Sequence, residues 1–185
     1  DYKIRLSAAS SGYQSVLPLS LITRFLSDLV LDNANKEDLS IKEKKQIEKE
    51  VNKVMNDKSL TDGVKFAMLR NISSRFKYSC FVNIVEEMEL NLYPESQRSV
   101  LFDLLSYANK IELNRLVLTT HSPYVINYLT LAAKAFLLTQ KISANETLQE
   151  RIKEVVPADS AIDPARLRIY ELKDGGVFRL STYEG

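Results

Sequence analysis

The stretch FVNIVEEMELNLYP, residues 81–94, decides how the rest of the chain is read. It starts as a short apolar run of the kind that forms a buried strand, and it continues into the carboxylates Glu86, Glu87 and Glu89. A carboxylate at the end of an apolar strand is costly unless something positive faces it. No basic residue follows until Arg98. The acids therefore either sit in water at a strand end or hold a metal ion and a reacting water.

The composition is that of one ordinary globular domain. Over 185 residues, 45% are apolar and 26% are charged, which predicts a single α/β domain with a well-buried core. The formal net charge of +1 gives no global field that would draw the chain to nucleic acid or to an anionic membrane. With one cysteine, Cys80, and one histidine, neither an internal disulfide nor a Cys/His zinc cluster can form. A reducing, cytoplasmic setting is therefore expected.

No membrane partner is expected either. We find no apolar run that approaches the roughly 20 residues of a membrane helix, and no basic and apolar leader opens the chain. The chain starts at Asp1 rather than at a methionine, and the strand-like run YKIRL follows at once. This start predicts a piece of a longer protein.

The amino-terminal region predicts a strand, a tight turn and a helix. Tyr2, Ile4 and Leu6 alternate as in a strand, and a helical apolar pattern follows. Proline is tolerated in the first turn of a helix, where its missing N–H would be unpaired anyway. Pro18 therefore places the predicted helix start close to Ser15.

Two further strands are expected, each followed by a helix. The run 81–85 precedes a helix that Pro94 opens, and the run 115–118 ends in two threonines and His121 before a second helix. For that helix we expect Ser122 to be the N-cap and Pro123 the first helical residue. Because both runs are continuously apolar, we expect parallel strands that are buried on both faces.

Three regions complete the predicted organisation. Residues 33–76 are polar and charged, and they predict a helical insertion in which SIKE, 40–43, has the form of a capping box. Residues 132–142 fit either a helix or a strand, and their periodicity does not decide between the two. Residues 166–183 predict a β-hairpin that turns at Asp174, Gly175 and Gly176.

Polar clusters fall at three places, ASSGYQS at 9–15, IVEEME at 84–89 and TTHSP at 119–123. In a parallel α/β sheet, ligands bind at the carboxyl ends of the strands, where the second and third clusters are expected. The first cluster is either a helix start with a glycine turn or an anion site, at which Ser11 and Gln14 would add donors to the helix N-terminus.

The acids and the histidine each have a structural and a functional interpretation. Glu86 and Glu87 are either a solvated pair or a catalytic pair, in which one faces Mg²⁺ and the other reaches a water beside a phosphate. His121 is either a satisfied structural residue or a hydrogen-bond partner of a γ-phosphate or of the attacking water. All three lie at predicted strand ends.

The three clusters together resemble motifs of ABC-type ATPases. LSAASSGYQSVLPL, 6–19, resembles the signature segment; FVNIVEEMELNLYPESQ, 81–97, resembles the Walker B segment; and LVLTTHSPYVIN, 116–127, resembles the switch-histidine segment. The resemblance is closest to bacterial AAA-type ATPases allied to the overcoming-lysogenisation-defect, RecF-like and SMC families. It covers most of the chain except the insertion, and it implies the carboxyl-terminal part of a P-loop NTPase fold, with parallel strands flanked by helices.

The resemblance also implies ATP and Mg²⁺ as ligands and a homodimer as the active form. Ser11 and Gly12, with Gln14 beside them, would contact the γ-phosphate of a nucleotide held by a partner subunit. Hydrolysis would then open and close the dimer.

The same resemblance implies roles for the acids and the histidine. Glu86 would bind Mg²⁺, Glu87 would polarise the hydrolytic water, and His121 would be the switch histidine. Two residues depart from the family pattern. Glu86 stands where Asp is frequent, which lengthens the metal ligand by one methylene, and Met88 stands where Pro is frequent, which is expected to loosen the turn.

The phosphate-binding loop is missing from this sequence. The five glycines stand at 12, 63, 175, 176 and 185, and none forms the pattern GxxxxGK followed by Ser or Thr. We therefore expect the 185 residues alone not to hydrolyse ATP, and we expect the phosphate cradle in the amino-terminal half of a longer protein.

Two other functions remain open from the sequence. The chain could be a non-catalytic assembly module whose charged helices bind DNA or a partner protein, although glutamates interleave with the lysines there. It could also be a metal-dependent nuclease in which Glu86, Glu87 and Glu89 bind two metal ions. The nuclease lacks a further acidic motif that we would expect.

Overall fold

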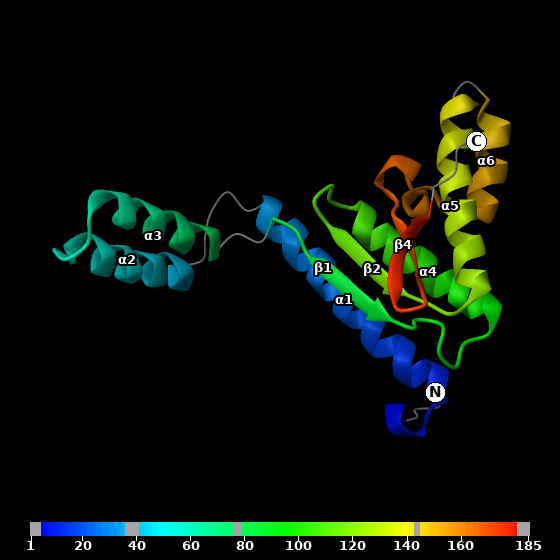
Figure 1. Ribbon diagram of the computed structural model, residues 1–185, viewed down its shortest axis with the longest axis horizontal. Coiled ribbons are helices and arrows are strands. Elements are labelled where there is room, and N and C mark those ends of the chain that lie inside the picture. The colour runs from blue at the N-terminus through cyan, green and yellow to red at the C-terminus, as the bar shows by residue number, and fades with distance from the viewer. Residues whose placement is uncertain (1–4, 36–40, 76–78, 143–144, 181–185) are drawn as a thin grey trace. The chain divides into compact units, whose positions relative to one another are not determined.

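A computed structural model describes residues 5–35, 41–75, 79–142 and 145–180 (Figure 1). The chain divides into two compact units, of which the first consists of Asp1–Arg24 and Val82–Gly185, and the second of Phe25–Phe81. Within the first unit, strands and helices alternate as the sequence predicts, which gives the α/β class of a partial P-loop NTPase fold. The predicted Ser40 of the capping box lies outside the described residues.

The centre of the first unit is a two-stranded parallel sheet. Strand β1, Val82–Glu86, pairs with β2, Arg115–Thr119, in a register that sets Val82 opposite Arg115 and Glu86 opposite Thr119. Helix α4, Pro94–Asn109, connects the two strands and starts at the predicted proline. Because the strands are parallel, their carboxyl ends meet at one edge of the sheet.

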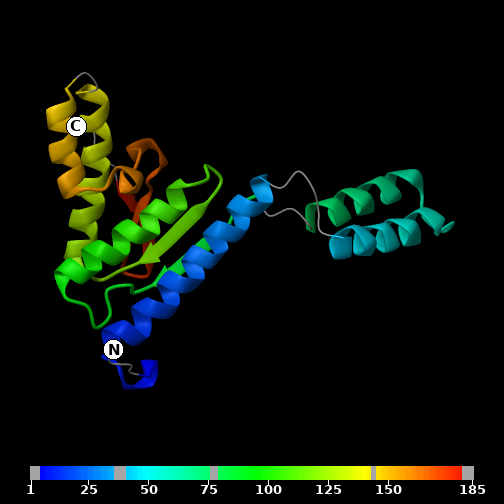
Figure 2. The same ribbon diagram turned by 180° about the vertical axis from the view of Figure 1, so that it is seen from behind.

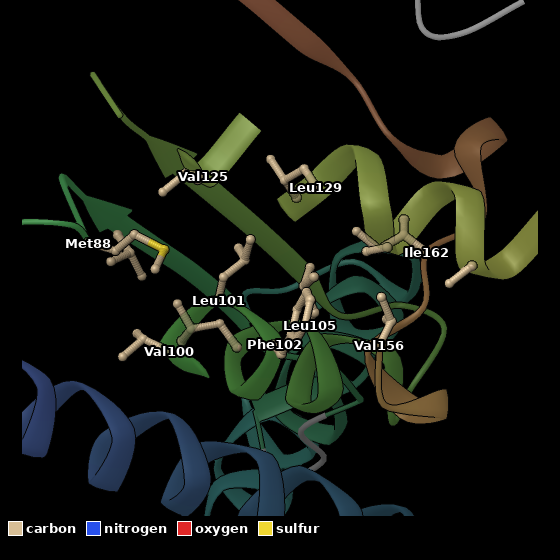
Figure 3. Packing of buried hydrophobic residues seen from close by; sticks show 13 residues of the cluster. Met88, Val100, Leu101, Phe102, Leu105, Val125, Leu129, Val156 and Ile162 are labelled. Atoms are coloured by element: carbon tan, nitrogen blue, oxygen red, sulfur yellow. The ribbon is translucent and has the colours of Figure 1, made fainter. Parts of the chain in front are cut away.

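The apolar core lies between the sheet and the helices (Figure 3). Leu101 and Val125 are fully buried, and Val85 of β1 is 6% exposed. Leu101 belongs to α4, and Val125 to helix α5, Pro123–Lys141. Leu116 and Leu118 of β2 pack against the same cluster. The core therefore fixes α4 and α5 against the same face of the strands.

Helix α5 continues to Lys141, so the segment 132–142, which fits either state in the sequence, is helical up to its last residue. It leads to α6, Glu146–Val155, which lies alongside α5 in both ribbon views (Figure 2). The following turns, Ala158–Ser160 and Pro164–Arg166, are short 3₁₀ helices. Ser160 is buried and donates its hydroxyl to the carbonyl of Phe102 at 2.9 Å, which ties this segment to α4.

Helix α1 runs over Ser11–Asn35 and begins before the start that Pro18 predicts. Pro18 therefore lies inside the helix, a position that usually costs about 3 kcal/mol. Local bonds hold the turns before it, because Ser15 Oγ donates to the carbonyl of Ser11 at 3.2 Å and Gln14 Nε2 donates to that of Ala9 at 2.8 Å.

The strand predicted over residues 2–6 is wrong at its carboxyl end. Residues 1–4 lie outside the described residues, and Leu6 belongs to a 3₁₀ turn, Leu6–Ala8. Backbone bonds from Ala8 to Arg5 and from Ala9 to Leu6 close this turn. The short i to i+3 pairing takes the donors that a strand would have offered to a neighbour.

One face of the sheet is exposed, which corrects the expectation that both faces are buried. The exposed fractions of Val82, Ile84 and Val117 are 57%, 68% and 47%. The alternating direction of strand side chains sends these three to the face opposite α4. No described element of the first unit covers them. The two strands are therefore apolar on both faces, although only one face is buried in the described part of this unit.

The second unit contains a pair of charged helices, α2 over Ile41–Asn56 and α3 over Asp62–Arg75, which pack against each other. Val54 of α2 and Ile72 of α3 are buried. Asp57 caps the connection by accepting from the Ser59 N–H at 2.9 Å and the Ser59 hydroxyl at 2.6 Å. This unit, Phe25–Phe81, includes the whole range 33–76 of the predicted insertion.

The chain closes with the predicted hairpin. Strand β3, Ile169–Lys173, pairs antiparallel with β4, Gly176–Leu180. The two turn residues, Asp174 and Gly175, have φ angles of 50° and 75°. Positive φ at both central positions is the conformation that tight hairpins favour, which is why an Asp-Gly pair stands there. The predicted end of the hairpin, 181–183, lies outside the described residues.

One helix among the described residues passes a length-and-composition test for a membrane span, which differs from the sequence expectation. It covers the 22 residues Ser11–Asp32. One such helix near the N-terminus is weak evidence, because core helices of soluble proteins pass the same test. Thr23 is buried here and accepts from the Asn83 amide of β1 at 2.9 Å, so this helix packs against the sheet.

The two faces of β1 provide a matched test of the core. Val85→Thr places a hydroxyl in the apolar core and should lower the free energy of unfolding by about 1–3 kcal/mol. Val82→Thr makes the same change on the exposed face and should stay within about 0.5 kcal/mol of the wild type. Urea denaturation of both variants measures the difference. Equal losses would contradict the assignment of the buried face.

Candidate functional site

The carboxyl ends of β1 and β2 bring two of the predicted site residues together. The parallel pairing extends one residue past β1, because the Glu87 N–H donates to the Thr119 carbonyl at 3.0 Å and to Thr119 Oγ1 at 3.3 Å. Beyond that point Glu87 Oε1 lies 3.5 Å from His121 Nε2. The carboxylate and the imidazole are 40% and 89% exposed, so water and ligand can reach both.

Glu87 has a backbone conformation that is rare outside glycine. Its φ is 47°, and a left-handed residue with a side chain costs about 1–2 kcal/mol. The Leu90 N–H donates to the Glu87 carbonyl at 3.0 Å and closes the turn. Strained residues of this kind concentrate at functional sites, where the surrounding structure holds them in place.

Met88, which stands where proline is frequent in the families that the chain resembles, is buried beside this turn. Its side chain is 5% exposed and belongs to the core cluster that also contains Val100 and Leu101 (Figure 3). The expectation that the absence of proline loosens the turn stays a prediction. A flexible unbranched side chain of this kind fills irregular gaps well.

Glu86 lies at the last position of β1 and is exposed. Its side chain points to the face opposite the core, as those of Val82 and Ile84 do. A single carboxylate with free access suits Mg²⁺, which takes one or two carboxylates and completes its shell with water and phosphate oxygens. Among the described residues no group of three His, Cys, Asp or Glu could hold a metal ion. A metal here would depend on ligands from a nucleotide.

Glu89 turns away from the other two acids. Its Oε1 accepts from the backbone N–H of His121 at 2.7 Å and from Thr120 Oγ1 at 2.8 Å. Burial by itself raises the pKa of Glu89, but the N–H of His121, its own N–H and the Thr120 hydroxyl outweigh burial and hold the pKa below its ordinary value. The two-metal nuclease, which needs Glu89 as a ligand, is therefore not supported by this geometry.

A buried amide joins the starts of the two helices, and no local pattern in the sequence indicates it. Gln97 is 7% exposed, its Oε1 accepts from Ser122 Oγ at 2.6 Å, and its Nε2 donates to the Leu92 carbonyl at 2.9 Å. Ser122 is the N-cap of α5, as predicted, but its hydroxyl makes no cap bond. That hydroxyl donates to Gln97 instead, and the Ser122 backbone N–H donates to Thr120 Oγ1 at 3.0 Å.

At the predicted anion site at the start of α1, Gly12 and Gln14 contact the protein's own backbone, and Ser11 is exposed. Gly12 is buried, and a Cβ there would lie 2.8 Å from the Asn91 carbonyl oxygen and 3.1 Å from Leu92 Cδ2. Glycine is thus needed for close contact with the turn after β1. Gln14 donates its amide to the carbonyls of Ala9 and Ser7, at 2.8 and 3.4 Å. Ser11, in contrast, is exposed in the first turn.

An open depression lies between α1 and the end of β1. Glu86 and Glu87 line it from the strand, and Ser15 lines it from the helix. Its apolar lining includes Val16, Leu19, Ile84 and Leu90. The acids therefore face a hollow whose other wall is the helix that starts at Ser11.

The lysines of the alternative assembly module are exposed on α2, at positions 42, 44, 45, 49 and 53. Glu48 is exposed on the same helix, and Glu43 and Glu50 are half-buried. Charges of both signs therefore alternate along the helix. This is the pattern of a solvated surface rather than of a basic stripe for nucleic acid.

Comparison with known proteins finds a family match at this site. Residues 82–127 match the family model described as "AAA domain, putative AbiEii toxin, Type IV TA system". The matched segment extends from β1 to the first turn of α5 and contains Glu86, Glu87, Glu89 and His121. This part of the chain is related to P-loop NTPase domains. No curated protein and no solved structure matches the chain.

The close contact at Gly12 generates a prediction about packing. Gly12→Ala places a methyl group against the Asn91 carbonyl and should lower the free energy of unfolding by about 1–3 kcal/mol. Gly63→Ala is the control, because nothing lies within 4 Å of a Cβ there and alanine favours helix by up to about 1 kcal/mol. The melting temperature should fall in Gly12→Ala and rise in Gly63→Ala, as thermal denaturation would measure. A stabilising effect of Gly12→Ala would contradict the contact.

The lowered pKa of Glu89 predicts how the fold responds to acid. A carboxyl whose pKa is lower in the folded than in the unfolded state stabilises the fold above its ordinary pKa, which is 4.5 for Glu89. That stabilisation is lost as the pH falls below 4.5 through the folded pKa. Glu89→Gln should therefore reduce stability at pH 7 and flatten its decline in acid.

Urea unfolding measured from neutral pH into this acid range tests the prediction. The control is Glu95→Gln, the same change on an exposed side chain in the first turn of α4, which should keep the acid decline of the wild type. An unchanged acid decline in Glu89→Gln would count against the hydrogen bonds to Glu89.

Proposed function

We propose that this chain forms the hydrolytic part of an ABC-like ATPase. The observation that carries the proposal is the 3.5 Å approach of Glu87 and His121 at the joined ends of two parallel strands. This is the edge at which parallel α/β sheets bind ligands. The pair also lies inside the segment that is related to P-loop NTPase domains. Mg²⁺ and ATP are the ligands that this proposal requires.

In the proposed reaction, Glu87 polarises the water that attacks the terminal phosphate. Phosphoryl transfer depends on positioning and on electrostatic stabilisation, so a carboxylate that orients the water is the central protein group. His121, 3.5 Å away, would hydrogen-bond the same water or the phosphate. Glu86, exposed at the strand end, would bind Mg²⁺ directly or through water. When bound, the metal ion would neutralise charge that develops on the phosphate oxygens.

The start of α1 would complete the site of a second copy. Ser11 is exposed in the first turn, where N–H groups and the helix dipole favour an anion. We propose that Ser11 and Gly12 contact the γ-phosphate of a nucleotide bound by the partner copy. Gln14 would support that contact by holding the preceding turn through its bonds to Ala9 and Ser7. We therefore propose an ATP-dependent homodimer as the active form, and we propose a cytoplasmic setting for it.

The phosphate cradle must come from another lobe, because the 185 residues contain no GxxxxGK pattern. The uncovered apolar face of β1 and β2 supports this step. Val82, Ile84 and Val117 are exposed there, and exposed apolar patches of this kind mark surfaces that another element covers. We propose that the cradle-bearing lobe packs on this face, and that the 185 residues alone do not turn over ATP.

The proposal predicts the effect of Glu87→Gln on ATP turnover by the full-length protein. Removing a group that orients and polarises the water should lower kcat by about 100- to 10,000-fold. Glu95→Gln, the same change on an exposed helix residue, should leave turnover unchanged. Steady-state phosphate release measures both. Undiminished turnover in Glu87→Gln would remove Glu87 from the reaction, and clear Mg-ATP turnover by the 185 residues alone would refute the need for a second lobe.

A further inference from the structure

A single carboxylate oxygen connects the turn after β1 with the turn after β2. Glu89 stands two residues after Glu87, yet its hydrogen bonds go to the other turn. Its Oε1 accepts from the His121 N–H at 2.7 Å and from the Thr120 hydroxyl at 2.8 Å. Glu89 therefore accepts from the backbone N–H of His121, and the imidazole of the same residue lies beside Glu87. Glu89 fixes the backbone from which that imidazole extends.

The imidazole of His121 has few other constraints. Its side chain is 89% exposed, and the contact described for it is the one with Glu87 at 3.5 Å. The backbone of an exposed residue limits the positions that its side chain can reach, and the backbone of His121 is held by an ionised acceptor. Bonds to an ionised acceptor are shorter and about twice as strong as neutral ones. The bond from the His121 N–H is therefore suited to set where the ring lies.

We propose that Glu89 is a positioning residue, which holds His121 in the orientation that places its ring against Glu87. This role rests on the proposed ATPase function, in which Glu87 and His121 act together on the attacking water. The hydrogen bonds described for Glu89 reach neither the carboxylate of Glu87 nor the imidazole of His121. It acts through the peptide N–H of His121.

The geometry also defines which replacements preserve the role. Both described hydrogen bonds use Oε1, while Oε2 is buried without a hydrogen-bond partner in the described part of the chain. Glu89→Gln can present its amide oxygen in the place of Oε1 and keep both bonds in uncharged form. Glu89→Asp is one methylene shorter and draws the acceptor back. Glu89→Ala removes it.

The decisive experiment uses the fact that the chain has a single histidine. Labelling the 185-residue chain with ¹⁵N- and ¹³C-histidine gives one backbone amide signal and one set of ring signals, all of which belong to His121. Glu87→Gln should shift the ring signal in the wild type, since the carboxylate lies 3.5 Å from the ring. In a Glu89→Ala background the same Glu87→Gln change should shift the ring signal little or not at all. An undiminished shift would overturn the proposal.

Two matched variants separate positioning from simple loss of a contact. Glu89→Gln should restore the response of the ring to Glu87→Gln, whereas Glu89→Asp should not. Thr120→Val removes the other donor to Oε1 but leaves the His121 N–H in place, so it should preserve the response. If Glu89→Ala does not fold, the comparison of Glu89→Gln with Glu89→Asp tests the proposal. Equal responses in these two variants would contradict the proposal.

ATP turnover provides a second measurement, and together with the ring experiment it separates the role of Glu89 from the proposed ATPase function. In the full-length protein, Glu89→Ala should lower kcat by up to about 100-fold with KM little changed, because it misplaces a reacting group without touching bound nucleotide. The ring experiment needs no nucleotide. A ring that responds as predicted in a protein without ATPase activity would refute the proposed function alone, and an unresponsive ring in an active enzyme would refute the role of Glu89 alone.

Discussion

The parallel pairing of β1 with β2 is the constraint on which the rest of the site depends. Its register sets Glu86 opposite Thr119, and the bond from the Glu87 N–H to the Thr119 carbonyl extends it by one residue. Two turns that are far apart in the sequence therefore leave the sheet side by side. Glu87 has a left-handed backbone at this point, and its carboxylate lies 3.5 Å from the His121 imidazole.

Much of this frame follows from local rules that act on the sequence. Pro94 and Pro123 begin α4 and α5 as predicted, because proline fits the first helical turn. Asp174 and Gly175 form the predicted hairpin turn, because both accept positive φ. Two continuous apolar runs, each followed by a helix, are enough to predict parallel strands whose ends meet. The approach of His121 to the acids follows from that topology.

The rest depends on contacts between distant segments, which no local pattern encodes. The bond between Gln97 and Ser122 joins residues 25 positions apart, and the one between Glu89 and His121 spans 32. The early start of α1 depends on the close approach of Gly12 to a turn that comes later in the chain. In the same way, the exposure of Ile84 could not be predicted, because an apolar strand carries no record of which layer covers it.

The central claim is that Glu87 and His121 share one pocket at the edge of the sheet. The most direct measurement is a nuclear Overhauser effect between the ring protons of the single histidine and the side-chain protons of Glu87, in a chain with selectively labelled His and Glu. With Glu87 Oε1 and His121 Nε2 3.5 Å apart, a cross-peak is expected, and it should be lost in Glu87→Gln, which removes the labelled glutamate. The absence of any cross-peak from His121 to Glu87 in the folded chain would contradict the account.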